Sequence, residues 1–315
     1  MAKIAFKKSK IYLVWAYICR QINNMEKSIK NYITLLFLAT VWGSSFILMK
    51  KGLLVFSDVQ VAALRLFIAF LSLVPFLFQA FKKVSRKHIF PILVMAFFGN
   101  GIPAFLFTKA QTQLDSSLVG ILNSLVPLFT LLLGIYFFKS RPSKTNIAGV
   151  LLGLSGAVFL ILFSMGGGVE INNYVFLVVL ATVMYAVSIN VIKKYLQGID
   201  SLSVTTLAFS ILGPLSAFYI FNTDFLMLAK TEQGLEALIY IALLAVVGTS
   251  SAVVIFNKLI SRSSAIFASS VTYLIPIIAI FWGIFDGENI TMHHILGVVI
   301  ILSGVYLVNK KSLIK

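Results

Sequence analysis

One stretch of the chain occurs twice, and this repetition decides the fold. Residues 127–134 read PLFTLLLG, and after a polar break residues 149–156 read GVLLGLSG. Near the C-terminus residues 276–283 read PIIAIFWG, and after another polar break residues 297–304 read GVVIILSG. The spacing from proline to glycine is the same in both copies, and the two octapeptides share Gly, Val, Leu, Ser and Gly in register. A repeat of this length inside apolar sequence is typical of a duplicated membrane unit.

Composition places the chain in a membrane. Hydrophobic residues make up 59% of the 315 residues, charged residues only 11%, and the mean hydropathy is +0.99. Soluble domains carry about 25% charged residues, so this chain cannot hide its apolar surface from water by folding alone. Its apolar runs approach the ~20 residues of a membrane helix and lack the alternation of barrel strands. We therefore predict an all-α polytopic membrane protein.

The apolar runs predict ten transmembrane helices with short linkers. We expect a first five-helix repeat over 31–164 and a second over 173–309, with a basic tail at 1–30 and a short tail at 310–315. The tail either lies on the inner leaflet as a basic amphipathic anchor or precedes the true start, with translation beginning at Met25 just before the first span; we favour the second interpretation. The predicted spans are 31–49, 59–80, 89–108, 116–138, 146–164, 173–192, 201–221, 235–257, 264–284 and 292–309.

The charges fix the expected orientation. The formal net charge is +16, and most of the 26 basic residues fall in the two tails and in alternate linkers. Only Lys50, Lys51, Lys109 and Lys230 fall in the other linkers, and Arg65 lies within a span. This asymmetry follows the positive-inside rule and predicts that both termini are cytoplasmic. It also explains the basic composition without a nucleic-acid partner.

An odd number of spans per repeat has a topological consequence. The second set of five spans must enter the membrane in the opposite sense, so the two repeats are expected to be inverted. Inverted repeats can exchange conformations and open a central site first to one side and then to the other. Alternating access is therefore the expected mechanism.

The acids give no proton relay at depth. None of the ten Asp and Glu residues lies in the middle of a predicted span, and the three His residues lie at span ends. Proton-coupled transport needs a carboxylate or imidazole in the membrane interior, where desolvation moves its pKa. The pattern therefore argues against a carboxylate-driven antiporter, unless the fold draws Asp58, Asp115 or Glu288 inward.

Polar side chains within spans are the candidates for a solute site. Arg65 is costly in a membrane and is either functional or a structural residue that snorkels or pairs with Asp58. Asparagine amides need several partners, which makes Asn100 and Asn123 the strongest cavity candidates. Pro127 and Pro276 are expected to interrupt paired spans, and the glycines of the octapeptides are expected to pack helices together. The full predicted substrate-binding set is Trp42, Ser45, Asn100, Asn123, Tyr185, Asn190, Ser250, Thr272 and Tyr273.

These features together resemble the EamA-type members of the drug/metabolite transporter superfamily. The resemblance covers residues 30–309 and rests on Trp42 to Phe46, on Arg65, and on the twice-repeated proline and glycine elements. Glu288 matches the family's acidic residue between paired spans, whereas the first half has Lys139 or Ser140 there. The resemblance implies a central cavity, no cofactor, and a bacterial inner (plasma) membrane location. It also implies export or exchange of amino acids, related small metabolites or drugs.

Two other classes of protein compete with a transporter. A membrane-embedded lipid-modifying enzyme would need an acidic metal site or a catalytic histidine at the interface, and the sequence supplies neither. A channel would not require inverted repeats. The expected partners are therefore a small-molecule solute and the lipid bilayer, and the sequence does not distinguish a monomer from a homodimer.

Overall fold

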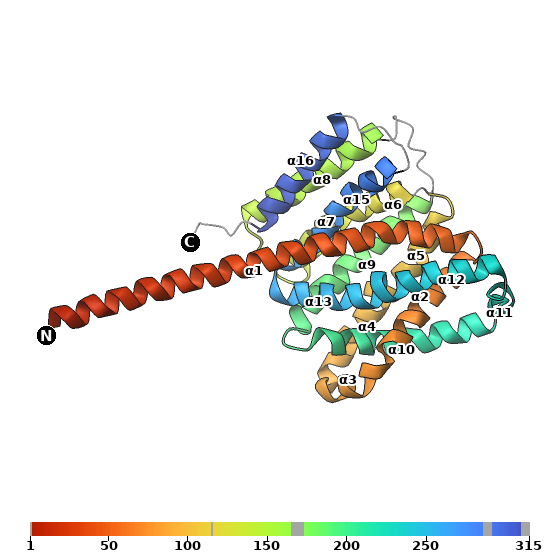
Figure 1. The fold of residues 1–315 in the computed structure, drawn as a ribbon, viewed down its shortest axis with the longest axis horizontal. Coiled ribbons are helices and arrows are strands. Elements are labelled where there is room, and N and C mark those ends of the chain that lie inside the picture. The colour runs from red at the N-terminus through yellow and green to blue at the C-terminus, as the bar shows by residue number, and fades with distance from the viewer. Residues whose placement is uncertain (1, 115, 165–172, 286–291, 310–315) are drawn as a thin grey trace.

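The computed structural model is helical throughout the part of the chain that it describes. It describes residues 2–114, 116–164, 173–285 and 292–309, and no strand occurs within these ranges. The helices form one bundle from which the first turns of the long N-terminal helix extend (Figure 1). Asp115 and Glu288 lie outside the described residues.

The first half of the chain forms helices at each of the five spans predicted for it. Several spans consist of consecutive helices that continue one another with a local change of geometry. The elements are α1 (Ala2–Leu53), α2 (Asp58–Leu73), η1 (Val74–Phe76), α3 (Leu77–Lys83), η2 (Arg86–His88), α4 (Ile89–Ala96), η3 (Phe97–Gly101), α5 (Ile102–Gln111), α6 (Ser116–Leu122), η4 (Asn123–Leu125), α7 (Val126–Tyr136) and α8 (Lys144–Ser164).

The second half is organised in the same way. A short helix, α11, lies outside the predicted spans and connects two of them. The elements are α9 (Tyr174–Tyr195), α10 (Ser201–Phe221), α11 (Phe225–Leu228), α12 (Glu232–Ala245), η5 (Val246–Ser251), α13 (Ala252–Arg262), α14 (Ala265–Ser269), α15 (Val271–Phe285) and α16 (Met292–Asn309).

Within the described residues, seven helical stretches are long and apolar enough to cross a membrane, for which about 20 residues are needed. Three shorter apolar helices, at Lys144–Phe159, Ala265–Ile278 and Ile295–Val308, lie where the remaining spans were predicted. The seven stretches are Ser28–Leu53, Asp58–Lys83, Arg86–Gln111, Leu118–Tyr136, Tyr174–Tyr195, Ser201–Phe221 and Glu232–Arg262. The protein is therefore a multi-pass membrane protein.

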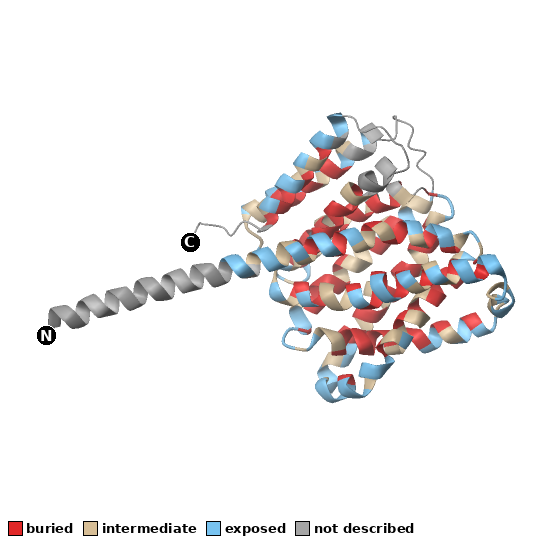
Figure 2. Ribbon diagram, in the orientation of Figure 1, coloured by how far each residue is buried: buried red, intermediate tan, exposed pale blue. Residues whose placement is uncertain are grey.

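Burial follows the logic of a membrane protein. Large apolar side chains such as Phe78, Phe90 and Phe218 are exposed on the outside of the bundle. Buried residues lie along the inward faces of the helices (Figure 2), and they include amides and hydroxyls as well as apolar side chains. Because lipid tails solvate apolar groups and cannot satisfy polar ones, this arrangement places the polar side chains inside the bundle.

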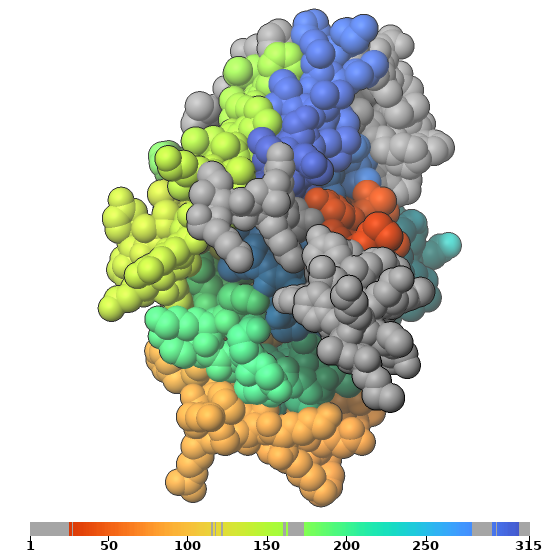
Figure 3. All heavy atoms as spheres, turned by 90° about the vertical axis from the view of Figure 1, so that its left-hand side faces the viewer, coloured from red at the N-terminus to blue at the C-terminus, as the bar shows by residue number. Residues whose placement is uncertain are grey.

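A glycine contact joins α8 and α16 along their length. A methyl group added at Gly149 would lie 2.8 Å from the carbonyl oxygen of Gly304, and one added at Gly304 would lie 2.5 Å from the backbone nitrogen of Gly153. The two helices lie side by side in both views (Figures 1 and 3). Their backbones approach this closely because the octapeptides supply glycine at the points of contact. These glycines therefore have the packing role expected from the sequence.

Several other helix contacts occur in matching pairs. The first helix, α1, packs against α12, α13 and α15, and its counterpart α9 packs against α4, α5 and α7. Likewise α10 packs against α4, and α2 packs against α12. The helices α2 and α10 pack against each other, as α8 and α16 do. These contacts of one half therefore have counterparts in the other.

The described part of the chain contains two π-helices, and they occur at equivalent places. One, η3, joins α4 to α5, and the other, η5, joins α12 to α13. π-Helices are rare and are frequent at functional sites. The expected proline breaks are less symmetric. Pro127 lies in the first turn of α7 directly after η4, whereas Pro276 lies inside α15 and the helix is interrupted earlier, at Ser270.

Candidate functional site

A cavity lies between the two sets of helices, and its walls come from both halves of the chain. The centres of water-sized molecules can occupy about 110 Å³ of it. Since one water needs only about 10–15 Å³ by this measure, the space admits a small organic solute or several waters. Both π-helices contribute to the lining, through Gly99 and Asn100 of η3 and through Thr249 of η5.

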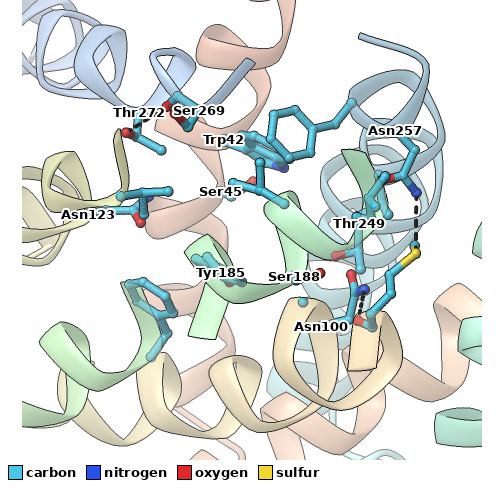
Figure 4. Close-up of a pocket in the computed structure, with 18 of the residues that line it drawn as sticks. Trp42, Ser45, Asn100, Asn123, Tyr185, Ser188, Thr249, Asn257, Ser269 and Thr272 are labelled. Carbon is cyan, nitrogen blue, oxygen red and sulfur yellow. Dashed lines mark hydrogen bonds between the residues drawn. The ribbon is translucent and has the colours of Figure 1, made fainter. Parts of the chain in front are cut away.

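Most of the residues singled out in the sequence meet in this cavity. They come from α1, α2, η3, η4, α9 and α15, which the folded chain brings together (Figure 4). Asn123 lies at one side of the view and Thr249 and Asn100 at the other, with Ser45 and Tyr185 between them. The predicted residues that line the cavity are Trp42, Ser45, Arg65, Asn100, Asn123, Tyr185 and Thr272.

Three other predicted substrate residues lie outside the cavity lining. The amide nitrogen of Asn190 donates to the carbonyl oxygens of Thr130 and Ala186, over 3.1 and 2.9 Å. Ser250 bonds to the Val246 carbonyl and accepts a hydrogen bond from the Ser72 hydroxyl. Tyr273 is fully buried and donates over 2.7 Å to the Val150 carbonyl of α8. Each of these side chains joins one helix to another.

Several lining residues were not in the predicted set. Ser188 follows Tyr185 by three residues, the spacing that separates Ser45 from Trp42, so a helical-face argument could have found it. The apolar members carried no signal that separates them from core residues. The additional lining residues are Phe46, Met49, Met95, Gly99, Phe107, Val126, Ser188, Ile189, Ile192, Thr249, Val253, Phe256, Asn257 and Ser269.

Arg65 extends from α2 to the second π-helix. Its Nε donates to the Thr249 hydroxyl over 2.6 Å, and that hydroxyl in turn donates over 3.0 Å to the carbonyl of Leu244. The alternative of an Arg65–Asp58 pair is wrong, because the Asp58 carboxylate instead pairs with Lys109 at 3.5 Å. The guanidinium is half-buried and lines the cavity.

The first π-helix carries a matching contact. The Asn100 amide nitrogen donates over 3.0 Å to the carbonyl of Met95, five residues earlier, as Thr249 does to Leu244. The glycines of the two π-helices also match. A methyl group at Gly99 would collide with the hydroxyl of Ser188, and one at Gly248 would lie 2.7 Å from the hydroxyl of Ser45. Each π-helix therefore approaches a serine of the opposite half at close range.

Aromatic side chains form much of the wall. Trp42 packs edge-on against Phe256, with ring centroids 5.0 Å apart, and its Nε1 donates over 3.0 Å to the Gly248 carbonyl. Tyr185 stacks on Phe107 at 5.7 Å. Aromatic walls with a few polar groups are the usual make-up of a small-molecule site.

The cavity has a positive electrostatic character. Among the described residues that line the cavity, Arg65 is the charged one, and none is an Asp, Glu or His. No group of three or more His, Cys, Asp or Glu residues that could hold a metal ion occurs among the described residues. The arrangement can bind a solute through amides, hydroxyls, aromatic faces and one guanidinium.

Comparison with known proteins gives a consistent picture. The sequence matches the EamA-like transporter family over residues 29–162 and 172–310. It is 24% identical to an uncharacterized transporter of Archaeoglobus fulgidus, over 90% of this chain and 99% of the relative. It is 25% identical to a probable amino-acid metabolite efflux pump of Salmonella typhimurium, over 86% and 92% of the two chains, and 23% identical to one of Escherichia coli, over 88% and 94%.

The fold also has a solved counterpart. One crystal structure is similar with a TM-score of 0.69 at 14% identity, covering 88% of this chain and 96% of the other. The family match extends over both halves of the chain and includes nearly all the residues that form the bundle and its cavity. The protein is therefore a member of the EamA-like transporter family.

Proposed function

We propose that the protein is a secondary transporter that exports or exchanges small metabolites by alternating access. The observation that carries the proposal is the polar, aromatic-walled cavity, whose lining is contributed by both halves of the chain. A solute held between two halves can be exposed to one side of the membrane and then to the other when the halves rock against each other.

The mechanism requires ten spans arranged as two inverted repeats. The matching contacts of α1 and α9, and the two π-helices, support a twofold relation between the halves. An odd number of spans per half makes that relation an inversion. The glycine contact of α8 and α16 would then keep the halves together while the helices around the cavity move.

Amino acids and related solutes are the proposed substrates. Relatives of similar length are named probable amino-acid metabolite efflux pumps. The cavity fits this class because it combines hydroxyls, amides and aromatic rings with one cation. The excess of basic residues at the tails and alternate linkers supports a plasma-membrane location with both termini cytoplasmic. Exposed Lys82, Lys83, Arg86 and Lys87 belong to this set.

The test is efflux from proteoliposomes that contain the full chain. Vesicles are loaded with single amino acids, and the solute released is compared with release from protein-free vesicles. We expect protein-dependent efflux of at least one amino acid that saturates with concentration. Efflux without saturation would indicate a channel, and absence of movement for the whole panel would remove the main support for transport.

The same vesicles test coupling. Because the cavity lining in the described chain contains no carboxylate or imidazole, we expect the initial efflux rate to be unchanged when an imposed pH gradient is collapsed with a protonophore. Strict dependence on the gradient would show that an acid elsewhere in the chain takes part in transport.

A further inference from the structure

We infer that the transported solute carries a carboxylate, and that Arg65 and Asn123 bind it in one fixed orientation. This inference rests on the proposed transport function and names the solute groups that the cavity recognises. The carboxylate pairs with the Arg65 guanidinium, and a hydrogen-bond donor at the other end of the solute, such as an ammonium group, faces the Asn123 side-chain oxygen.

The guanidinium of Arg65 is only partly satisfied by the protein. Arginine has five N–H donors, and the described residues accept from Nε alone, through Thr249. The salt bridges of the described chain are Glu26–Lys30, Asp58–Lys109 and Lys83–Asp200, so Arg65 has no acidic partner there. An arginine within a membrane span is costly unless a counter-charge or water compensates it.

The hydrogen bond to Thr249 leaves the guanidinium able to bind an anion. Because Nε is held by the hydroxyl of η5, the planar group is fixed and the two terminal nitrogens remain as parallel donors. Paired donors of this kind match the two oxygens of a carboxylate. Tyr185 lines the same cavity as Arg65 and provides a further hydroxyl there.

Asn123 supplies the opposite end of the site. Its side chain lines the cavity and is 7% exposed, and its Oδ1 has no hydrogen-bond partner among the described residues. A buried acceptor without a partner is unfavourable, which a donor on a bound solute would relieve. Figure 4 shows Asn123 across the cavity from Thr249, the residue that holds Arg65.

The two ends of the site differ in strength. The carboxylate meets a full charge in a partly desolvated cavity, whereas the donor meets a neutral amide oxygen. No acid lines the cavity in the described chain, so an ammonium group finds no counter-charge there. Removing the carboxylate from a solute should therefore reduce binding far more than removing the amino group.

The test compares three forms of one solute. The amino acid that moves fastest in proteoliposomes is compared with its carboxamide, which lacks the negative charge, and with its des-amino acid, which lacks the ammonium group. At solute concentrations well below saturation, we expect efflux of the carboxamide to fall by at least about 30-fold. Efflux of the des-amino acid should fall by about 2- to 10-fold.

Variants then assign the two ends. Arg65→Gln should remove the preference for the acid over its carboxamide, and Arg65→Lys should retain part of it because the charge remains while the paired donors are lost. Asn123→Ala should remove the preference for the amino acid over the des-amino acid. Lys258→Gln on the exposed face of α13 is the matched loss of a positive charge and should change neither ratio.

Because each result is a ratio measured on one variant, partial loss of folded protein does not change it. Equal efflux of acid and carboxamide by the wild-type chain would overturn the inference and leave transport intact. Retention of the preference in Arg65→Gln would also overturn it. Absence of movement for every amino acid would overturn the inference and, separately, the proposed function.

Discussion

The indole Nε1 of Trp42 in α1 donates a 3.0 Å hydrogen bond to the carbonyl of Gly248 in the π-helix η5. Ser45 follows Trp42 by three residues on α1, and a methyl group added at Gly248 would lie 2.7 Å from the Ser45 hydroxyl oxygen. The first span is therefore in register with the π-helix of the other half at the wall of the cavity. A shift of α1 relative to η5 would therefore displace cavity residues on both helices.

We expect Trp42→Phe to lower the free energy of unfolding by about 1 kcal/mol, because an aromatic ring remains while one partly buried hydrogen bond is lost. We also expect slower efflux, since the ring and η5 are no longer held together. Thermal unfolding followed by circular dichroism, with proteoliposome flux, checks both. A variant as stable and as active as wild type would show that the hydrogen bond is dispensable.

We expect Asn123→Ala to reduce efflux while leaving insertion and folding intact. Its Oδ1 makes no hydrogen bond to the described residues, so truncation removes the proposed ligand for the solute and no helix–helix bond. Flux per folded molecule, with size-exclusion chromatography to count folded protein, is the measurement. Wild-type flux in this variant would remove Asn123 from the site.

Asn190→Ala is the matched asparagine control. Asn190 bonds to the carbonyls of Thr130 and Ala186 outside the cavity lining, so its loss should lower stability by about 1–3 kcal/mol. The preference of each variant among solutes separates the two residues, because only Asn123→Ala should change it. A changed solute preference in Asn190→Ala would place that residue at the solute after all.

We expect Gly304→Ala to destabilise the bundle by about 1–3 kcal/mol, because the added methyl group meets the backbone of Gly153 and Gly149 and the helices must separate. Ser303→Ala on the same helix is the control. Ser303 is exposed and bonds to the Val299 carbonyl of its own helix, so it should change stability by less than about 0.5 kcal/mol. Equal thermal stability of the two variants would contradict the close packing of α8 and α16.

Asp200 gives a prediction for pH. It caps α10 and accepts hydrogen bonds from the backbone nitrogen and hydroxyl of Ser203 and from Lys83. Burial raises the pKa of Asp200, but the hydrogen bonds from Ser203 and the charge of Lys83 outweigh burial and hold the pKa below its ordinary value of 3.8. The ionised carboxylate therefore stabilises the fold above the unfolded pKa, and this stabilisation is lost as the pH falls through the folded pKa.

Asp200→Asn should accordingly be less stable than wild type at pH 6, with the difference disappearing as the pH approaches 3. The side chain is 43% exposed, so solvent screens the interaction and the difference should be about 0.5 kcal/mol or less. When Asp200→Asn is made in a Lys83→Gln background, its effect on stability at pH 6 should be smaller than in the wild-type background. A difference independent of pH would show that the charge of Asp200 does not contribute.

The helices and the family could be read from local sequence, whereas the cavity could not. Each predicted span overlaps a helix, because hydropathy over about 20 residues reports directly on transfer into lipid. The packing role of the glycine octapeptides could also be predicted, since small residues in apolar helices allow two helices to approach closely. Among the polar residues the sequence was less informative. Asn123 and Asn190 look alike as sequence, yet one lines the cavity and the other bonds to α7.

The difference between Ser250 and Thr249 has a geometric cause. Neighbouring residues of a helix point about 100° apart, so a one-residue change of register exchanges a cavity position for a packing position. The π-helix η5 makes such a local change, and the sequence gives no sign of it. The sequence by itself determined the membrane class, the repeated unit and seven of the residues that line the cavity. Only the tertiary structure decided which side chains face the cavity, because this depends on the rotation of each helix against its neighbours.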